Sequence, residues 1–411
     1  MLRRLLTVTF LLFVFTSTFS IALSQFLLGV SVLLGIAIVV RERALPFTVG
    51  MRPIWAAIAL YVTWLIAVCL YHDDPLRGLD HIREDWLFLL MPLGLVALQA
   101  AKTRERMVQV LSAGLILISV ASLLMYVTGY QYSWHEGITP LSEGNPRVRG
   151  NFTHALTFGN YTAIGGAFVL AWVLRGWDRI KRVTGMLGLA AAFFGLVAVL
   201  LCGSRGPVFA FAAGVVVLLF SMAGRRRKWL IGLTATLLII GLAVPTVRSR
   251  FGKELGWHFN SEWPGGRLYV WGRSLEIIAA NPFTGVGPGN FSEAYKQVLP
   301  DNITKRYWYG HAHNDFLQAA ARSGILGLFL FANLWVAMAR GYRIVRKRAG
   351  PSGVGPEMAA AVIGSIVFFV ASMTEATFAD EEVRVVLMLI WSVGLVVLYK
   401  VETGEPDGVP G

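Results

Sequence analysis

The sequence predicts an all-α, polytopic membrane protein with about twelve transmembrane helices and one enlarged, partly helical loop before the tenth span. Hydrophobic residues make up 55% of the 411 residues and charged residues only 15%, with a mean hydropathy of +0.61. This composition is typical of chains that lie in lipid. Because only helices and closed barrels cross lipid, we expect a single helical transmembrane domain over residues 1–400.

The predicted spans are apolar runs of about 20 residues, the length that a helix needs to cross a bilayer. The run after Arg4 continues without a charge to Val40, which is too long for a cleaved signal peptide, so we expect two retained helices there. Residues 401–411, rich in Gly and Pro, are expected to form a disordered cytoplasmic tail. The twelve spans are predicted near residues 5–20, 24–40, 53–71, 86–101, 107–128, 156–174, 183–202, 206–223, 229–247, 315–339, 357–375 and 383–400.

Positive charge marks one side of the predicted bundle. Clusters of Lys and Arg alternate with the spans so that they fall on the side of the N-terminus, where 22 of the 37 basic residues gather. Cytoplasmic loops of membrane proteins are enriched in Lys and Arg, so we expect both termini in the cytoplasm. The net charge of +13 does not indicate nucleic-acid binding, because the basic residues lie in short inter-helix clusters and not along one face.

The opposite, outer side of the bundle receives the polar chemistry. All seven histidines fall there, and a titratable group that takes part in a reaction must meet water and substrate. The longest outer loop, residues 248–314, ends in paired histidines directly before an apolar helix, so we expect the active-site region in this loop. Cys69 and Cys202 form no metal or redox motif, and the sequence leaves their pairing open.

His311 and His313 are the sharpest feature of this loop. Asn314 and Asp315 are favoured N-caps for the helix that follows, which would place His313 beside the positive end of a helix dipole. That position disfavours imidazolium and leaves a ring nitrogen able to accept a proton near neutral pH. Two alternatives stay open: interfacial histidines bound to loop carbonyls, or a His-x-His metal pair with Asp315, although no further ligand stands at a recognisable spacing.

Arginines on the outer side are candidates for binding an anion such as a diphosphate. Arg205, in the segment Cys-Gly-Ser-Arg-Gly-Pro, stands where two spans meet, and it either belongs to a substrate path or extends to the lipid headgroups. Arg267 follows Pro-Gly-Gly and opens a helix over residues 267–280, whose free N–H groups would suit a phosphate. Arg273 either contributes to the site or pairs with Glu276, three residues further on.

Three further features concern the same outer side. Arg147 and Arg149 add two cations in the second outer loop, for which a solvated loop is the alternative. The glycines of Gly285-Val-Gly-Pro-Gly289 resemble a nucleotide-binding motif superficially, but no strand precedes them, so we interpret the segment as a turn. Arg322 lies inside the tenth predicted span and therefore needs a partner or a polar cavity.

At these positions the sequence resembles the O-antigen ligase/polymerase superfamily of bacterial membrane glycosyltransferases, and its compact loops are most similar to the ligase members. The resemblance covers most of the chain, implies a GT-C-like helical fold, and rests on the order of its motifs together with the twelve-span layout. Arg322 is a departure, because many relatives are expected to carry an acidic residue there. The motifs are Ser204-Arg-Gly206, Arg267 with Trp271, Asn281-Pro282, Gly285-Val-Gly287, Asn290-Phe291, His313-Asn314 with Leu317, and Gly324.

The resemblance implies a metal-independent, inverting reaction at the periplasmic face of the bacterial inner membrane. A glycan would pass from undecaprenyl diphosphate to a sugar hydroxyl of lipid A–core, without a cofactor. His313 would take the proton from the acceptor hydroxyl, and Arg205 and Arg267 would stabilise the leaving diphosphate. Substrate-binding roles are expected for Arg147, Arg149, His311, Arg273 and Asn314.

Two other functions remain open at this point. An O-antigen polymerase or a protein O-oligosaccharyltransferase would share the donor and the leaving group, so motifs cannot separate them from a ligase. A transporter of a lipid-linked or anionic solute is disfavoured, because transporters favour repeats and charges near the midplane of the membrane. Here the predicted spans are clean and the charges collect at the outer surface.

Overall fold

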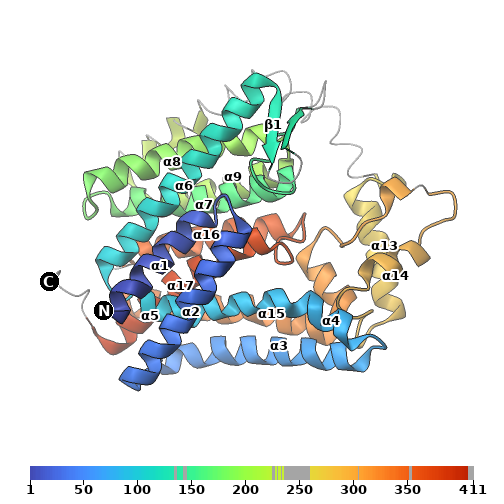
Figure 1. Cartoon of the computed structure of the whole chain (residues 1–411), viewed down its shortest axis with the longest axis horizontal. Coiled ribbons are helices and arrows are strands. Elements are labelled where there is room, and N and C mark those ends of the chain that lie inside the picture. The colour runs from blue at the N-terminus through green and yellow to red at the C-terminus, as the bar shows by residue number, and fades with distance from the viewer. Residues whose placement is uncertain are drawn as a thin grey trace.

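Helices account for nearly all of the regular structure in the computed structural model (Figure 1). The structure describes residues 1–133, 137–141, 146–224, 227–228, 230–232, 234–235, 260–303, 305–350 and 354–405. A hairpin of β1 (Tyr130–Ser133) and β2 (Gly137–Pro140) follows α6. The helices are α1 (Leu2–Thr16), α2 (Ile21–Glu42), α3 (Arg52–Tyr71), α4 (Pro75–Ile82), α5 (Leu90–Ala97), α6 (Ala101–Thr128), α7 (Ala155–Gly176), α8 (Arg182–Leu201), α9 (Arg205–Ser221), α13 (Arg267–Ala280), α14 (Phe291–Gln297), α15 (Asp315–Ala349), α16 (Pro356–Ser372) and α17 (Glu381–Thr403).

The long helices coincide with predicted spans. Within the described residues, seven helices are long and apolar enough to cross a membrane: α2, α3 with the turn before it, α6, α7, α8, α15 and α17. Helices α9 and α16 are shorter but also apolar, and α1, with 15 residues, lies on the first predicted span. The prediction of an all-α polytopic membrane protein is therefore confirmed, whereas the count of twelve spans stays a prediction.

The structure corrects two predicted segments. Residues 86–101 do not form one helix, because a 3-10 helix (Arg83–Leu89) leads into the short α5, which packs against α17. Hydropathy rises equally in a segment buried by protein and in one that faces lipid, which explains the predicted span. Helix α17 continues to Thr403, so residues 401–403 do not belong to a disordered tail. Residues 406–411 and most of the predicted span 229–247 lie outside the described residues.

Helix α7 occupies the centre of the bundle. In the most apolar 18-residue stretch of α7, 94% of the residues are buried inside the protein. The helix packs against α8, α9, α16 and α17. Small residues along α7, among them Gly159, Gly165 and Gly166, are buried. Small side chains let helix backbones approach each other closely, which is the main source of packing between membrane helices.

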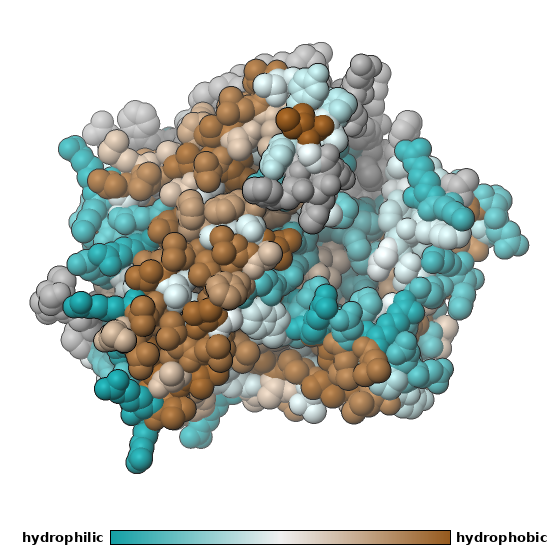
Figure 2. Space-filling view, in the orientation of Figure 1, coloured by the Kyte–Doolittle hydropathy of each residue, from teal (hydrophilic) through white to brown (hydrophobic). Residues whose placement is uncertain are grey.

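The two ends of the bundle differ. Helix α1 begins and α17 ends on the left of Figure 1, whereas α13 and α14 lie together on the right, beside the start of α15. Figure 2 shows a broad apolar surface over the helices between these two ends, with hydrophilic residues gathered on the left and on the right. This is the arrangement expected of helices that cross a bilayer. We call the end that carries α13 and α14 the site end.

Helix α15 is interrupted at Ser323 and Gly324, whose backbone angles are not helical. The loop after α13 docks into this interruption, where the Ile325 N–H donates to the Pro282 carbonyl at 2.8 Å. The Trp64 indole donates to the Ser323 carbonyl at 2.9 Å. Irregular backbone within a membrane helix is tolerated where neighbouring groups satisfy its hydrogen bonds, and these contacts do so here.

The glycine-rich turn after Pro282 lies against the same interruption. The Val286 N–H donates to the Ala321 carbonyl at 2.8 Å, and Gly285 and Gly287 adopt positive φ angles of 65° and 85°. A Cβ on Gly285 would collide with the Ala321 carbonyl. The interpretation of this segment as a turn is confirmed, and its glycines are needed because the turn approaches another backbone closely.

We predict that Gly324→Ala destabilises the protein. Gly324 has φ 72° and ψ −176°, a region almost restricted to glycine, and a Cβ there would collide with the Phe283 carbonyl. The strain alone costs on the order of 1–3 kcal/mol. Thermal unfolding in detergent should show a lower midpoint for this variant. Gly272→Ala on α13, where a Cβ meets nothing within 4 Å, is the matched control, and an equal midpoint in both variants would contradict this account.

Candidate active site

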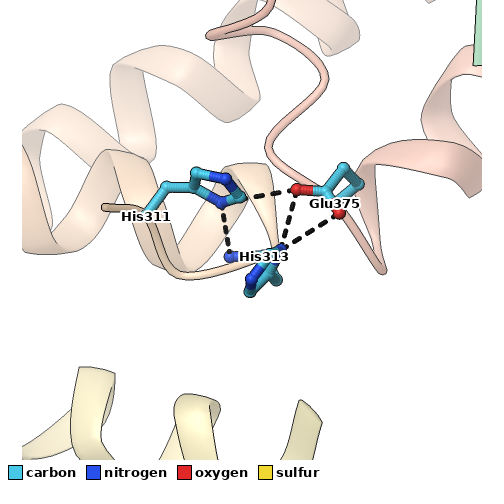
Figure 3. Close-up of side chains that lie close together, drawn as sticks. All are labelled: His311, His313 and Glu375. Atoms are coloured by element: carbon cyan, nitrogen blue, oxygen red, sulfur yellow. Dashed lines mark hydrogen bonds and ion pairs between the residues drawn. The ribbon is translucent and has the colours of Figure 1, made fainter. Parts of the chain in front are cut away.

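Three segments that are distant in the sequence converge on the carboxylate of Glu375 at the site end. Glu375 lies between α16 and α17, His311 and His313 precede α15, and Arg267 is the first residue of α13. Figure 3 shows both imidazole rings facing the carboxylate. His313 Nδ1 lies 2.8 Å from Glu375 Oε1 and 3.0 Å from Oε2, and His311 Nδ1 lies 3.4 Å from Oε1.

His313 is held in one orientation from several directions. Its φ of 50° is one of two positive values at non-glycine residues in the described chain, and such strained backbone occurs preferentially at functional sites. The Trp271 indole donates to its carbonyl at 3.3 Å, and the Tyr309 ring meets the imidazole edge-on with centroids 5.0 Å apart. The buried Nε2 has no hydrogen-bond partner among the described residues. An imidazole that donates from Nδ1 to Glu375 presents an unshared pair at Nε2.

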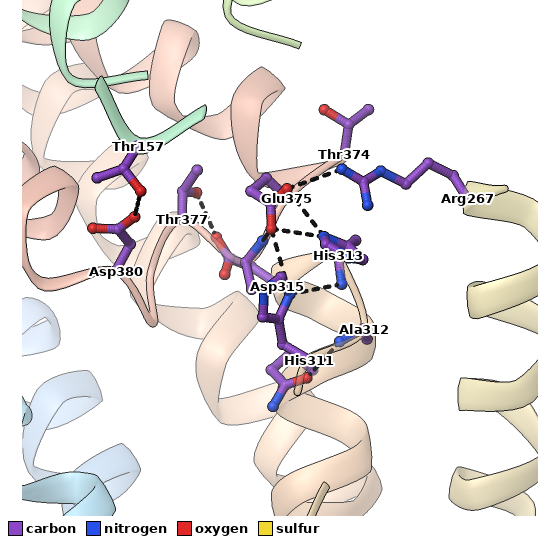
Figure 4. A network of polar contacts seen from close by, with 12 residues as sticks. Thr157, Arg267, His311, Ala312, His313, Asp315, Thr374, Glu375, Thr377 and Asp380 are labelled. Carbon is purple, nitrogen blue, oxygen red and sulfur yellow. Dashed lines mark hydrogen bonds and ion pairs between the residues drawn. The ribbon is translucent and has the colours of Figure 1, made fainter. Parts of the chain in front are cut away.

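Arg267 brings a cation to the same carboxylate. Its Nη2 lies 3.0 Å from Glu375 Oε2, and the exposed fractions of the two side chains are 25% and 11%. Figure 4 shows the guanidinium reaching across from α13 to Glu375 beside Thr374. The Gly265-Gly266 pair before Arg267 leaves the N-terminus of α13 without a side-chain cap. Arg267 therefore combines its own charge with the uncapped N–H groups of a helix start.

Burial dominates the electrostatics of this cluster. It lowers the pKa of His313 and of His311 because it disfavours imidazolium, and Glu375 opposes the shift while Arg267 adds to it. For Glu375 burial would raise the pKa, but the His313 hydrogen bond and the nearby positive charges outweigh burial and lower the pKa to about 2. Near neutral pH the site therefore holds an ionised Glu375, a charged Arg267 and a neutral His313.

Asn314 and Asp315 fasten the segment that carries Glu375 to the start of α15. The Asn314 Oδ1 accepts from the first N–H groups of the helix, as predicted for an N-cap, while its Nδ2 donates to the Met373 carbonyl at 3.0 Å. The buried Asp315 carboxylate accepts from the Thr377 hydroxyl at 2.8 Å and from the Phe378 N–H at 3.0 Å. The two residues after His313 therefore fix the position of its partner.

The first turn of α9, which begins at Arg205, lies next to the segment that carries Glu375. A Cβ on the adjacent Gly206 would lie 3.0 Å from Thr374 Oγ1, so the start of α9 contacts the residue before Glu375. Helices α9 and α13 therefore both begin next to the segment that carries Glu375. Their first residues, Arg205 and Arg267, are the two arginines expected to act on an anion.

Arg147 and Arg149 bind loop backbone near this end. Arg147 donates from Nε to the Cys202 carbonyl at 3.2 Å and from Nη2 to the Ser204 hydroxyl, which fixes the turn before α9. Arg149 donates from Nη1 to the Thr153 carbonyl at 3.1 Å. Their contacts with a substrate stay predictions. The structure gives Arg147 a further role, because the turn that it holds presents Arg205.

Arg273 lies on α13, but its side chain contacts groups other than the Glu375 carboxylate. Its Nη1 pairs with Glu276 at 2.9 Å and donates to the Val298 carbonyl at 3.4 Å, and its guanidinium lies over the Tyr269 ring. The alternative pairing with Glu276 is thus the one that the structure contains. The structure does not place Arg273 at the Glu375 carboxylate, and its role in substrate binding stays a prediction.

Arg322 has the partners that its position required. It donates from Nη2 to the Tyr61 hydroxyl at 2.8 Å and lies 3.9 Å from Asp85 Oδ2. The other carboxylate oxygen of Asp85 accepts from Arg384 at 2.6 Å. These buried charges lie next to the interruption of α15. They compensate one another, as buried ions must.

The cluster also has the spacing of a metal site. The ligand atoms of His311, His313 and Glu375 all lie within 4.8 Å of one another, whereas Asp315, the third ligand suggested by the sequence, binds Thr377 and Phe378 instead. Arg267 already supplies a cation 3.0 Å from the carboxylate. A metal bound to His313 Nδ1 would have to replace the proton that this nitrogen donates to Glu375. We therefore interpret the cluster as a hydrogen-bonded acid–base group.

Glu375 was not predicted from the sequence. It lies 62 residues after His313, on the other side of two helices, so no local spacing connects the two residues. The available signal is weak. Glu375 is an acidic residue between two apolar spans with no basic residue within nine positions before it or eight after it, and such a charge needs a partner from elsewhere in the fold.

Comparison with known proteins agrees with this geometry. Residues 189–332 match the protein-family model described as O-Antigen ligase, a stretch that includes Arg205, Arg267 and His313. The chain is 26% identical over 244 residues to the exopolysaccharide production protein ExoQ of Rhizobium meliloti, covering 54% of this chain and 51% of that protein. It is also 26% identical over 286 residues to a protein of Rickettsia felis named "Putative polysaccharide ligase", covering 66% and 64%.

The alignments thus span about half to two thirds of the length of these curated relatives. The two candidate arginines and the candidate base lie inside the segment that matches the family model. The helical membrane fold agrees with it. The resemblance expected from the sequence is therefore confirmed over residues 189–332, which match the O-antigen ligase family model, and between half and two thirds of the chain is similar to two proteins named for polysaccharide production or ligation.

Proposed function

We propose that the protein transfers O-antigen glycan from undecaprenyl diphosphate to a sugar hydroxyl of lipid A–core. The observation that carries this proposal is the pairing of His313 Nδ1 with Glu375, which leaves Nε2 as a base beside Arg267. The reaction needs both a base for the acceptor hydroxyl and cations for the diphosphate. Both are present in one cluster whose sequence lies mainly in the matched family segment.

In the proposed reaction the acceptor oxygen attacks the anomeric carbon while the bond to the diphosphate breaks, with inversion. The proton of the hydroxyl passes to His313 Nε2, and the ionised Glu375 stabilises the imidazolium that forms. The leaving diphosphate carries away the bonding electron pair, and Arg205 and Arg267 balance its growing charge. The two guanidinium groups would thereby take the role that a divalent metal has in other glycosyltransferases.

We place the site end at the periplasmic face of the bacterial inner membrane. Support comes from the positive-inside pattern, because the basic clusters of the sequence lie on the side of the N-terminus. Helix α1 begins and α17 ends away from α13 and α14 (Figure 1). Both termini would then be cytoplasmic, and the partners would be the lipid-linked donor, the lipid A–core acceptor and the bilayer.

A polysaccharide polymerase is the second candidate. The similarity to a protein named for exopolysaccharide production favours it, because a polymerase would use the same donor and the same base. Only the acceptor differs: a second lipid-linked glycan replaces lipid A–core. The acceptor must bind opposite the diphosphate in either case, so the cluster at Glu375 serves both reactions equally.

We predict that His313→Ala abolishes transfer, with a loss of at least roughly 10²-fold because the general base is removed. Purified protein would be incubated in EDTA with an undecaprenyl-diphosphate-linked glycan and rough lipopolysaccharide, and a gel would report the glycan on lipid A–core. His154→Ala, which removes an exposed histidine, is the control. Persistent transfer by His313→Ala would refute the base assignment, and lengthening of the donor without labelled lipid A–core would favour the polymerase.

The same assay tests the arginines. Arg205→Ala and Arg267→Ala should lose turnover, and the Lys variants should recover only part of it, because an ammonium group cannot reproduce the bidentate fork. Full activity with Lys would mean that only a positive charge is required.

We predict that Glu375→Gln lowers the rate and shifts the acid limb of the pH profile. In the wild type burial lowers the pKa of His313 from its ordinary value, so activity should persist at mildly acidic pH and fall once His313 becomes protonated. Glu375 raises this pKa, so its neutralisation should move the acid limb to lower pH while the rate at pH 7.5 falls, by roughly 10²-fold or more. An acid limb at an unchanged pH would argue against the pairing.

A further inference from the structure

The Glu375 carboxylate contacts three side chains in this site. Arg267 Nη2 and His313 Nδ1 both lie 3.0 Å from the same oxygen, Glu375 Oε2, and His313 also lies 2.8 Å from Oε1. His311 Nδ1 lies 3.4 Å from Oε1. The negative charge that orients the proposed base is therefore shared with a guanidinium from another helix. As long as Arg267 stays there, it compensates part of the charge that would stabilise imidazolium.

Arg267 is also the group best placed to meet an incoming anion. It stands at the uncapped start of α13, its side chain is more exposed than Glu375, and one of its five N–H donors is engaged with the carboxylate. A diphosphate carries more negative charge than a carboxylate and accepts the bidentate fork of arginine. The uncapped N–H groups of α13 add to its attraction.

We propose that binding of the lipid diphosphate draws Arg267 away from Glu375, so that the donor itself releases the carboxylate to serve His313. This exchange rests on the proposed function, because it assumes a diphosphate donor. No covalent step is involved, only the replacement of one ion pair by another. The acceptor hydroxyl then meets an effective base only after the donor is in place.

The direction of the effect follows from the groups that face His313. Arg267 from α13 lowers its pKa, and Glu375 from the segment between α16 and α17 raises it. The loop before α15 adds Tyr309, whose own pKa is raised by burial so that it stays neutral, and His311, which burial keeps neutral near pH 7. Departure of Arg267 therefore raises the pKa of His313, and the negative charge of the diphosphate acts in the same direction.

The test measures the protonation of His313 without turnover. Deuterium exchange at the C2 position of each imidazole, followed by mass spectrometry of peptides, gives a titration midpoint for individual histidines in the full-length protein. The probe is farnesyl diphosphate, a soluble polyprenyl diphosphate without a glycan, and farnesol is the uncharged control. We expect the midpoint of His313 to rise with farnesyl diphosphate and to stay unchanged with farnesol.

Variants distinguish the loss of the Arg267–Glu375 ion pair from the direct effect of the negative charge of the diphosphate on the pKa of His313. Arg267→Gln should raise the midpoint of His313 with no ligand present, and farnesyl diphosphate should then add less than in the wild type. Arg83→Gln, which removes an exposed arginine paired with Asp80 at 3.0 Å, should titrate like the wild type. Circular dichroism and thermal unfolding would verify that each variant is folded.

Several outcomes would overturn the proposal. A midpoint in ligand-free Arg267→Gln equal to that of the wild type would show that the pair does not control His313. An equal ligand-induced rise in both proteins would assign the effect to the diphosphate alone. Either result leaves the proposed function standing, which fails separately if the wild-type protein moves no glycan from the undecaprenyl diphosphate donor to any acceptor in the gel assay. No change in the wild type with millimolar farnesyl diphosphate would also refute the exchange.

Discussion

The buried carboxylate of Glu375 is the interaction on which the site depends. It joins the start of α13, the loop before α15 and the connection between α16 and α17 through contacts of 2.8 to 3.4 Å. A buried charge is costly without partners, so these three segments must come together when the chain folds. Arg267 and His313 satisfy the carboxylate, and in doing so they acquire the geometry that the chemistry requires.

Two sets of hydrogen bonds hold these three segments next to one another in an otherwise apolar protein. The first is the Asn314–Asp315 pair, which binds the backbone of the Glu375 segment directly after the base. The second is the interruption of α15, where the loop after α13 forms backbone hydrogen bonds with the open helix turn. That docking ties α13, and hence Arg267, to the same helix that begins beside His313. One helix therefore positions both the base and the cation.

The parts of this arrangement that follow from local pattern could be predicted from the sequence. The capping residues Asn314 and Asp315 predict the start of a helix directly after His313. The glycines before Arg267 likewise predict a helix that begins at Arg267. The partner of His313 could not be predicted, because Glu375 is connected to it only through the packing of α15 and α16. The irregular segment at 86–101 was missed for a related reason: burial by protein and burial by lipid select the same apolar residues.

Under the proposed function, the charges of the site would supply what a bound metal supplies in other glycosyltransferases. Burial keeps the pKa of His313 low, and Arg267 lowers it further while Glu375 opposes the shift. A metal ion bound to His313 Nδ1 would replace the hydrogen bond that orients the proposed base toward Glu375. A guanidinium avoids this conflict, because it can exchange partners without removing a ligand from the imidazole. In the proposed exchange the positive charge that moves is therefore a side chain, and His313 keeps its Nδ1 contact with Glu375 throughout.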